Sequence, residues 1–481
     1  MKKIVSILLC SAISILQFTS CNDFLKEEPR STIDPDAFYQ NAKQAESGVI
    51  AIYCGFTGQY GFYKLFPMTE LPTDQGMVGY AGDIVLTSLD DFTYDANNTN
   101  FKGFWQHCYR VINRANMAIT KLPDVPDLTE DKRNSLMAEA RFLRAVFYFN
   151  LVRWFGDVPL IEGYTQSIDN LQVPRTSKEK VYESIVEDLK FASEYLPVEY
   201  SSKEEGRAVR AAGKIMLAKV YVTMAGYPCQ QTDKWKLAAD ILDETLSVPY
   251  SGYLFENIED LWKEENENSK EHILSSQFLS GVINNTILPA SFAPRSSGIQ
   301  AIQSTGEIAP EQTFYDSFDK QDKRLELLKT EYPHYTSGEI VKFDKPFCFK
   351  YYDPCVGNKC GRNFPILRYA DALLLLAESL NEVSYGNQKA FDAINAVRHR
   401  AGLEDLKISD FNQASFRTVV QEERNKELCF EGHRWFDLVR TGKFIETMKK
   451  TIPSIDEHHL LFPIPQREMD ANPQLKQNPG Y

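Results

Sequence analysis

The sequence lacks several features that would place the body of the protein in a membrane or on nucleic acid. Beyond its first sixteen residues it has no apolar run of about 18 residues, roughly the least that spans a bilayer as a helix. Basic residues are in deficit, because 53 Lys and Arg stand against 66 Asp and Glu, and the formal net charge is −13 at pH 7. Such a charge repels phosphate backbones. We therefore predict no nucleic-acid partner and no membrane-spanning helix in the body of the chain.

Motifs of catalysis and cofactor binding are missing as well. The chain has no Gly-x-Ser-x-Gly nucleophile elbow, no phosphate-binding loop and no dinucleotide fingerprint. No Glu-x-x-His pairs accompany the Glu-x-x-x-Glu steps of residues 423–431, so a di-iron site is not indicated, and no paired C-x-x-C spacing suits zinc. His458 and His459 are adjacent, so we expect their side chains to point apart rather than to share a metal. The sequence therefore predicts no catalytic residue, no metal site and no cofactor.

Cysteine use is limited. Of nine cysteines, Cys10 and Cys21 lie in the N-terminal segment, and the seven others are an odd number that excludes a complete disulfide framework. Cys348, Cys355 and Cys360 cluster near glycines, where one bridge that closes a loop would suit an exported protein. Buried thiols are the simplest interpretation of the remaining cysteines.

The N-terminus has the layout of an export signal. Two lysines precede an apolar segment from Ile4 to Leu16, and small residues then lead to Cys21, although Phe18 stands where the usual lipoprotein box has Leu. We predict that residues 1–20 are a lipoprotein signal peptide and that Cys21 carries lipid as the first mature residue. Two acyl chains on one residue suffice for stable anchoring. The alternative is an ordinary cleaved signal in which Cys21 comes first by coincidence.

Hydrophobic periodicity at helical spacing occupies two separate blocks. In the first, apolar residues recur from Leu136 to Trp154 around almost the whole circumference, which predicts a deeply buried helix that stops at Gly156. The other stripes run from Val181 to Leu196, Ala211 to Ala225, Trp235 to Val248, Ile366 to Leu380, Ala390 to Ala401 and Phe416 to Phe430. These patterns predict a mainly α fold.

Two regions without a helical period interrupt this scaffold. Residues 55–104 and 249–362 are rich in Gly together with Tyr, Asn, Ser or Pro. We predict that residues 21–481 form a single domain whose loop-rich insertions carry the ligand site. The helix spacing is typical of tetratricopeptide-like pairs, and a non-repetitive helical array is the alternative.

The densest set of charges lies near the end of the second block. Glu423, Glu427 and Glu431 follow one another at i, i+4 spacing, so they would repel unless basic groups such as Arg424 and Arg434 intervene. A glycoside hydrolase needs two carboxylates that flank a bound sugar, which successive turns of one buried helix do not offer. We therefore interpret the set as a structural salt-bridge network.

Ordered motifs along the chain resemble one protein family. The matching segments are Glu139–Ala145, Tyr148–Phe149, Trp154–Leu160, Arg368–Glu378, Asn395–Arg398, Ala401–Leu403, Glu423–Arg424, Glu427–Leu428, Glu431–Arg440, Phe462–Pro465 and Gln477–Tyr481. In this order, after a lipoprotein-type start, they resemble the SusD/RagB-like nutrient-binding outer-membrane lipoproteins of Gram-negative bacteria. The resemblance runs over nearly the whole chain.

The resemblance implies a mainly helical fold with tetratricopeptide-like pairs, in a surface-exposed lipoprotein anchored to outer-membrane lipid through Cys21. It also implies that the protein captures a glycan or oligosaccharide and delivers it to a partner SusC-like TonB-dependent transporter. A glycoside hydrolase and a purely structural surface lipoprotein are the alternatives. A hydrolase would release new reducing ends, whereas a structural protein would neither bind nor cleave.

Sugar binding needs aromatic faces for the rings and polar side chains for the hydroxyls, and both loop-rich regions supply them. The resemblance singles out Asp74, which follows Glu70, and Tyr94 with Asn97 and Asn98. The predicted ligand-binding residues are Asp74, Tyr80, Tyr94, Asn97, Asn98, Phe292 and Arg295. For each of them an ordinary packing role in a loop is the alternative.

Overall fold

The computed structural model describes residues 38–57, 65–80, 82–166, 171–201, 206–246, 249–279, 286–355 and 360–481. The predicted signal peptide and Cys21 lie outside these ranges. Within them, no helix combines the length and the apolar character needed to cross a bilayer.

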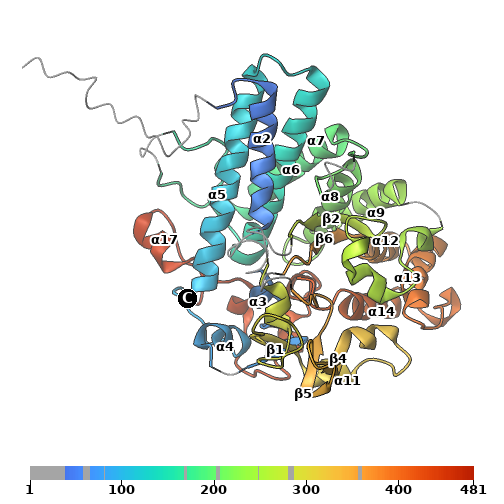
Figure 1. The fold of residues 1–481 in the computed structure, drawn as a ribbon. Helices are drawn as coiled ribbons and strands as arrows, with labels where there is room; N and C mark the ends of the chain where they lie inside the picture. The colour runs from blue at the N-terminus through green and yellow to red at the C-terminus, as the bar shows by residue number, and fades with distance from the viewer. Residues whose placement is uncertain are drawn as a thin grey trace, which may run out of the picture.

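Long helices form the scaffold. They are α2 (Ala42–Tyr53), α5 (Thr99–Lys121), α6 (Glu130–Phe155), α7 (Lys178–Tyr195), α8 (Arg210–Ala225), α9 (Lys234–Thr245), α12 (Tyr369–Val383), α13 (Gln388–Arg400) and α14 (Gln413–Glu427). From α5 to α9 each helix packs on the next, and α12 packs on α9, α13 and α14. Figure 1 shows α2, α5 and α6 side by side, with the later helices following toward α12, α13 and α14. The predicted mainly α scaffold of paired helices is confirmed.

Helix α6 is buried along most of its length. The Thr129 side chain accepts a hydrogen bond from the Lys132 N–H and begins the helix, and Gly156 ends it with φ 70°. Apolar side chains cover nearly its whole circumference, and Trp154, Phe142 and Phe147 are fully buried. Each such side chain contributes roughly 1.5–3 kcal/mol of burial free energy, which explains why the helix needs no polar face.

Shorter elements lie in the two regions predicted to be loops, between the long helices and after α14. The short α-helices are α3 (Leu65–Glu70), α4 (Ile84–Asp90), α10 (Leu288–Phe292), α11 (Gln312–Asp316), α15 (Arg434–Arg440), α16 (Phe444–Met448) and α17 (Gln466–Ala471). The 3-10 helices are η1 (Cys54–Phe56), η3 (Leu122–Asp124), η4 (Tyr250–Tyr253), η5 (Ile258–Trp262), η6 (Glu264–Asn266), η7 (Lys323–Leu327), η8 (Ile408–Asp410) and η9 (Glu457–Leu460). The strands are β1 (Gly76–Val78), β2 (His272–Ser276), β3 (Ile308–Pro310), β4 (Leu328–Pro333), β5 (Ile340–Cys348) and β6 (Phe364–Arg368). They pair as antiparallel two-stranded ribbons β1–β3, β2–β6 and β4–β5.

Several expectations about element boundaries were wrong. Residues 249–362 are not structureless, because four strands of the described part of the chain, β2 to β5, lie within this range. Ile366, expected to begin a helix, lies in β6 instead. Helix α14 ends at Glu427, since Phe430 and Gly432 have φ of 59° and 79°, so Glu431 lies on a turn rather than on the helix.

The predicted loop-closing disulfide joins Cys355 to Cys360. Cys348, the third member of the cluster, is a buried free thiol. The expectation that the other thiols are buried fails at Cys54, which is exposed, and at Cys229, which is partly exposed.

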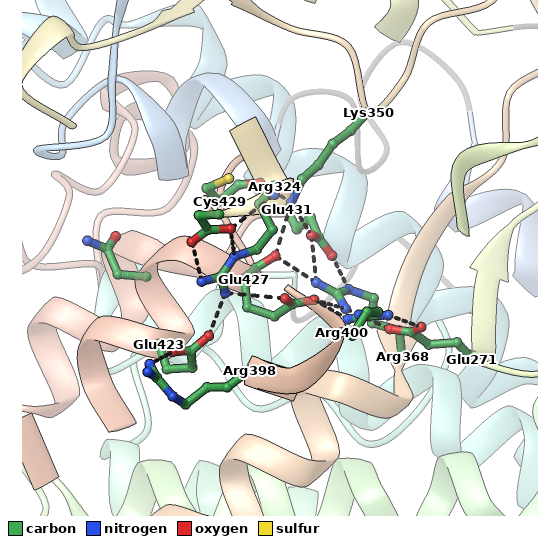
Figure 2. Close-up of polar contacts among 12 residues, drawn as sticks. Glu271, Arg324, Lys350, Arg368, Arg398, Arg400, Glu423, Glu427, Cys429 and Glu431 are labelled. Carbon is green, nitrogen blue, oxygen red and sulfur yellow. Dashed lines mark hydrogen bonds and ion pairs between the residues drawn. The ribbon is translucent and has the colours of Figure 1, made fainter. Parts of the chain in front are cut away.

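A buried ion-pair network joins the loop-rich insertion to the helical scaffold (Figure 2). The Glu427 carboxylate contacts Arg400 Nη2 at 2.6 Å, Arg368 Nη1 at 2.8 Å and Arg324 Nη1 at 3.4 Å. All four side chains are nearly inaccessible to solvent. Burial alone would raise the pKa of Glu427, but the three guanidiniums lower it well below its ordinary value.

The other two glutamates have partners in the same network. Glu423 contacts Arg324 at 2.6 Å and Arg398 at 2.9 Å, and Glu431 contacts Arg368 and Lys350, each at 2.6 Å. The structural role of the three glutamates is therefore confirmed.

The prediction that Arg424 and Arg434 neutralise the three glutamates was wrong. The Arg424 guanidinium pairs with Asp371 and Asp437, and the Arg434 guanidinium pairs with Asp74. The neutralising cations come instead from segments distant in the sequence.

We expect Glu427→Ala to lower the free energy of unfolding by about 3–5 kcal/mol, because the variant leaves buried guanidiniums without their shared carboxylate. Glu422→Ala, at an exposed position of the same helix, is the control and should stay within about 0.5 kcal/mol of the parent. Urea denaturation measures both. Equal midpoints for the two variants would show that the network does not hold the fold together.

Candidate functional site

The two loop-rich regions meet at the β1–β3 ribbon. Gly76 is paired with Pro310 and Val78 with Ile308, and the Gly79 N–H donates to the Glu307 carbonyl at 3.1 Å. This antiparallel pairing fixes the chain that follows β1 beside the chain that leads into β3. In Figure 1, β1, β4, β5, α4 and α11 gather at one end of the molecule.

Tyr80 and Arg295 lie against each other at this junction. The Arg295 guanidinium carbon is 3.6 Å from the centroid of the Tyr80 ring. Tyr80 is 48% exposed and Arg295 is exposed, so both can be reached from solvent. Among the described residues no carboxylate forms an ion pair with Arg295. The pair therefore presents an aromatic surface beside unused N–H donors, a combination that suits a polyhydroxylated ring.

A second aromatic pair, half-buried His334 and exposed Tyr335, lies on the turn between β4 and β5. The rings of His334 and Tyr335 stack with centroids 5.5 Å apart, and Tyr335 is 51% exposed. The Tyr335 N–H donates to the Gly298 carbonyl at 2.9 Å, which ties this turn to the segment that follows Arg295. Gly298 has φ 67°, and a Cβ there would lie 2.3 Å from His334 Nε2, so the close approach requires glycine.

His334 and Tyr335 were not predicted as site residues. The available signal was a tyrosine-bearing turn between Pro333 and Gly338, but a turn of this composition is common on protein surfaces. Only the fold shows that it adjoins the segment of Arg295.

A small apolar cluster supports this surface from below. It consists of Ala293, Ile299, Ala309, Phe347 and Phe349, and it is separate from the main core. The Tyr352 hydroxyl donates to the Ile299 carbonyl at 3.0 Å, which fixes the backbone a few residues beyond Arg295. The candidate site is therefore built on packed segments rather than on unsupported loops.

The segment that leads into β1 is fixed to α15. Arg434 donates from Nε and Nη2 to the two Asp74 carboxylate oxygens at 2.6 and 2.5 Å, so Asp74 holds the segment in place. Its carboxylate is also 31% exposed, so its predicted role as a ligand partner stays a prediction. Glu70 is fully buried, and its Oε1 accepts the Gly432 N–H at 2.8 Å. Burial raises the pKa of Glu70 to about 8.

Two predicted aromatic ligands lie in the core instead. Tyr94 is 7% exposed, stacks on Tyr481 and meets Phe462 edge-on. Phe292 is 1% exposed and packs edge-on against Phe66. Neither ring offers a face to a ligand, so both are removed from the site.

Of the two predicted asparagines, Asn98 has a structural role, whereas the role of exposed Asn97 stays a prediction. The Asn98 side chain accepts the Asn100 N–H at 2.9 Å and begins α5, and its amide donates to Ser88 Oγ at 3.2 Å. Asn97 is exposed on the preceding turn, where its backbone N–H donates to Asp95 at 2.7 Å. Of the seven predicted residues, the structure brings Tyr80 and Arg295 into direct contact.

His458 and His459 do not point apart as expected. Their ring centroids are 3.7 Å apart, and each Nδ1 faces the Asp456 carboxylate. Asp456 begins η9 through a capping box with His459, which explains the arrangement by local backbone geometry.

Known proteins resemble this chain over nearly its full length. A family model described as "SusD family" matches residues 335–481, and one described as "Starch-binding associating with outer membrane" matches residues 23–222. SusD-like protein P2 of Formosa agariphila is 27% identical over an alignment that covers 98% of each chain. A SusD-like protein of Bacteroides ovatus is 26% identical and is covered over 83% of its length, with 91% of this chain aligned.

Solved structures show the same fold. A SusD homologue from Bacteroides thetaiotaomicron is 28% identical, with a TM-score of 0.83 over 95% of this chain and 100% of that one. A laminarin-binding SusD-like protein is 26% identical, with a TM-score of 0.76 over 92% of this chain and 100% of that one.

We expect Glu70→Gln to reduce the pH dependence of stability. The pKa of Glu70 is about 8 in the folded state and 4.5 in the unfolded state. The contribution of this group to the stability of the fold is therefore largest below pH 4.5. That stability is lost as the pH rises toward 8, by about 1.4 kcal/mol per pH unit. Glutamine keeps an acceptor for Gly432 and removes the titration.

Urea denaturation at pH 5, 6.5 and 8 measures this effect on the free energy of unfolding. The Gln variant should be more stable than the parent at pH 8 and should change less between pH 5 and 8, whereas the exposed control Glu422→Gln should follow the parent. Parallel curves for the parent and Glu70→Gln would contradict the raised pKa.

Proposed function

The chain belongs to the SusD family, and from this premise we propose that it is a non-enzymatic glycan-binding lipoprotein of the cell surface. Its binding site is the surface formed by Tyr80, Arg295, His334 and Tyr335. The ligand is an oligosaccharide whose rings lie on the aromatic side chains and whose hydroxyls accept hydrogen bonds from Arg295.

The observation that carries this proposal is the stacking of Arg295 on Tyr80 at the junction of the two loop-rich regions. Because each side chain holds the other, little rotamer freedom remains to be lost when a ligand binds. The relatives agree in ligand class, since one family model is described as starch-binding and one structural neighbour as laminarin-binding.

The state of the clustered carboxylates supports binding without turnover. Glu423, Glu427 and Glu431 are buried and bonded to guanidinium or ammonium groups. They cannot flank a sugar in solvent or exchange a proton with a glycosidic oxygen. The proposal therefore assigns glycan cleavage to other proteins.

Two further parts of the proposal rest on family membership. Cys21 carries the lipid that holds the protein in the outer membrane, a location that agrees with the family description "associating with outer membrane". A SusC-like TonB-dependent transporter receives the captured oligosaccharide.

We expect Tyr80→Ala and Arg295→Ala each to weaken glycan binding by about 1–3 kcal/mol while leaving the melting temperature unchanged, because both side chains are exposed. The matched controls are Tyr253→Ala, a tyrosine that is also 48% exposed, and Arg114→Ala on the solvent side of α5. A polysaccharide panel in a retardation gel identifies the ligand, and calorimetry then measures the affinities.

Parental affinity in both folded site variants would place the glycan elsewhere. Incubation of the parent with the same glycan should release no new reducing ends, and their appearance would instead support a hydrolase.

We expect Cys21→Ala to release the protein from membranes without weakening its binding of glycan, because the variant cannot be lipidated. Fractionation of a host that lacks the transporter measures the anchor alone. Full retention of the variant in the outer-membrane fraction would contradict the proposed lipidation.

A further inference from the structure

A cavity of about 530 Å³ lies apart from the Tyr80 surface, among α6, α7, α8, α15 and the C-terminal segment. This volume is in the range of sites for small organic molecules. Most of its wall is apolar or aromatic, and includes Val152, Tyr182, Phe436, Val439, Leu460 and Leu461. Such walls favour an apolar body over a sugar with its many hydroxyls.

Arg153 lines this cavity with a cation that lacks a counterion. Its guanidinium carbon lies 3.9 Å from the centroid of the Phe149 ring and 3.4 Å from that of Phe436. Nε donates to the Phe149 carbonyl at 3.2 Å, and Nη2 donates to Asn150 Oδ1. Within the described part of the chain, no carboxylate oxygen lies within 4.0 Å of this guanidinium. Burial lowers its pKa to about 9, so it remains charged at neutral pH.

Two neighbouring charged side chains, unlike Arg153, are bonded to a charged or titratable partner. Arg440, which lines the same cavity, contacts Glu378 at 2.6 Å and Asp437 at 2.8 Å. Asp456 also lines the cavity, but its side chain is 61% exposed and is bonded to His458. Lys178 and Glu457 line it too, Lys178 at 3.9 Å from Glu179 and Glu457 as an exposed carboxylate. Arg153 is therefore the cation of this lining that has no ion-pair partner among the described residues.

We propose that this cavity is a second binding site, which takes a small organic carboxylate with an apolar body. The body lies among the aromatic and aliphatic walls, and the carboxylate pairs with the Arg153 guanidinium. The two flanking phenyl rings hold the planar cation in place before the ligand arrives, so the charge-assisted hydrogen bonds form with little loss of side-chain entropy. This site is independent of the proposed glycan site.

The test compares three probes of equal length, 4-phenylbutanoate, 4-phenylbutanol and 4-phenylbutylamine, by titration calorimetry on the purified protein. The carboxylate should bind roughly tenfold or more tightly than the alcohol, and the amine most weakly. Arg153→Gln should remove the preference for the carboxylate, whereas the exposed control Arg114→Gln should keep it. Equal affinity for the three probes, preference for the amine, or no binding of the carboxylate would each overturn the proposal.

Cys229 provides a readout that locates the probe. It lines the cavity and is partly accessible, while Cys54 is exposed on η1 and serves as an internal control. Bound 4-phenylbutanoate should slow alkylation of Cys229 several-fold and leave Cys54 unaffected, as measured by peptide mass spectrometry. Equal rates at Cys229 with and without the bound probe would place it elsewhere.

A cavity-filling variant gives the same answer if Arg153→Gln fails to fold. Cys229→Trp alters a partly exposed residue on a turn at the edge of the core, so the fold should survive and the carboxylate should no longer bind. Unchanged affinity in a folded Cys229→Trp variant would overturn the proposal.

Discussion

The arrangement of the chain depends on the ion pairs that the Glu427 carboxylate forms. It lies at the end of α14 and meets three guanidiniums, which come from η7, from the residue before α12 and from α13. Glu271, from the residue before β2, contacts two of the same guanidiniums, those of Arg368 and Arg400. A charge buried in this way is tolerated only when its partners are all in place. The network therefore requires the loop-rich insertion to return to one position on the helical scaffold.

The position of the insertion determines the exposed surface at its other end. Arg324 of η7 and Lys350 are bonded to the glutamates, and the same insertion contains β3, which pairs with β1, and Arg295, which lies on Tyr80. A second link runs through Asp74 and Arg434, which hold the segment before β1 against α15. The candidate glycan surface is thus shaped before any ligand arrives, and this reduces the entropy lost on binding.

The sequence predicted those elements whose pattern lies within one continuous stretch of chain. Helix α6 is an example, since its apolar repeat and Gly156 are both visible in one stretch of chain. The partners of Glu427 were not predictable in this way, because Arg324 lies 103 residues away and Arg368 lies 59 residues away. Nearby Arg424 was the natural expectation, but its side chain pairs with Asp371.

The sequence predicted the two regions that form the candidate site, but only some of the residues in it. Composition identified both insertions, yet it could not separate an exposed ring such as Tyr80 from a buried one such as Tyr94. The burial of Tyr94 depends on Phe462 and Tyr481 near the other end of the chain. Short strands such as β1 were likewise invisible, because three residues carry no recognisable period.

Hydrogen–deuterium exchange with and without a saturating glycan tests the central claim most directly. The account predicts slower exchange in the segments that contain Tyr80, Arg295 and Tyr335, with the helices around α6 unchanged. Unchanged exchange in all three segments, together with protection on another part of the molecule, would contradict it.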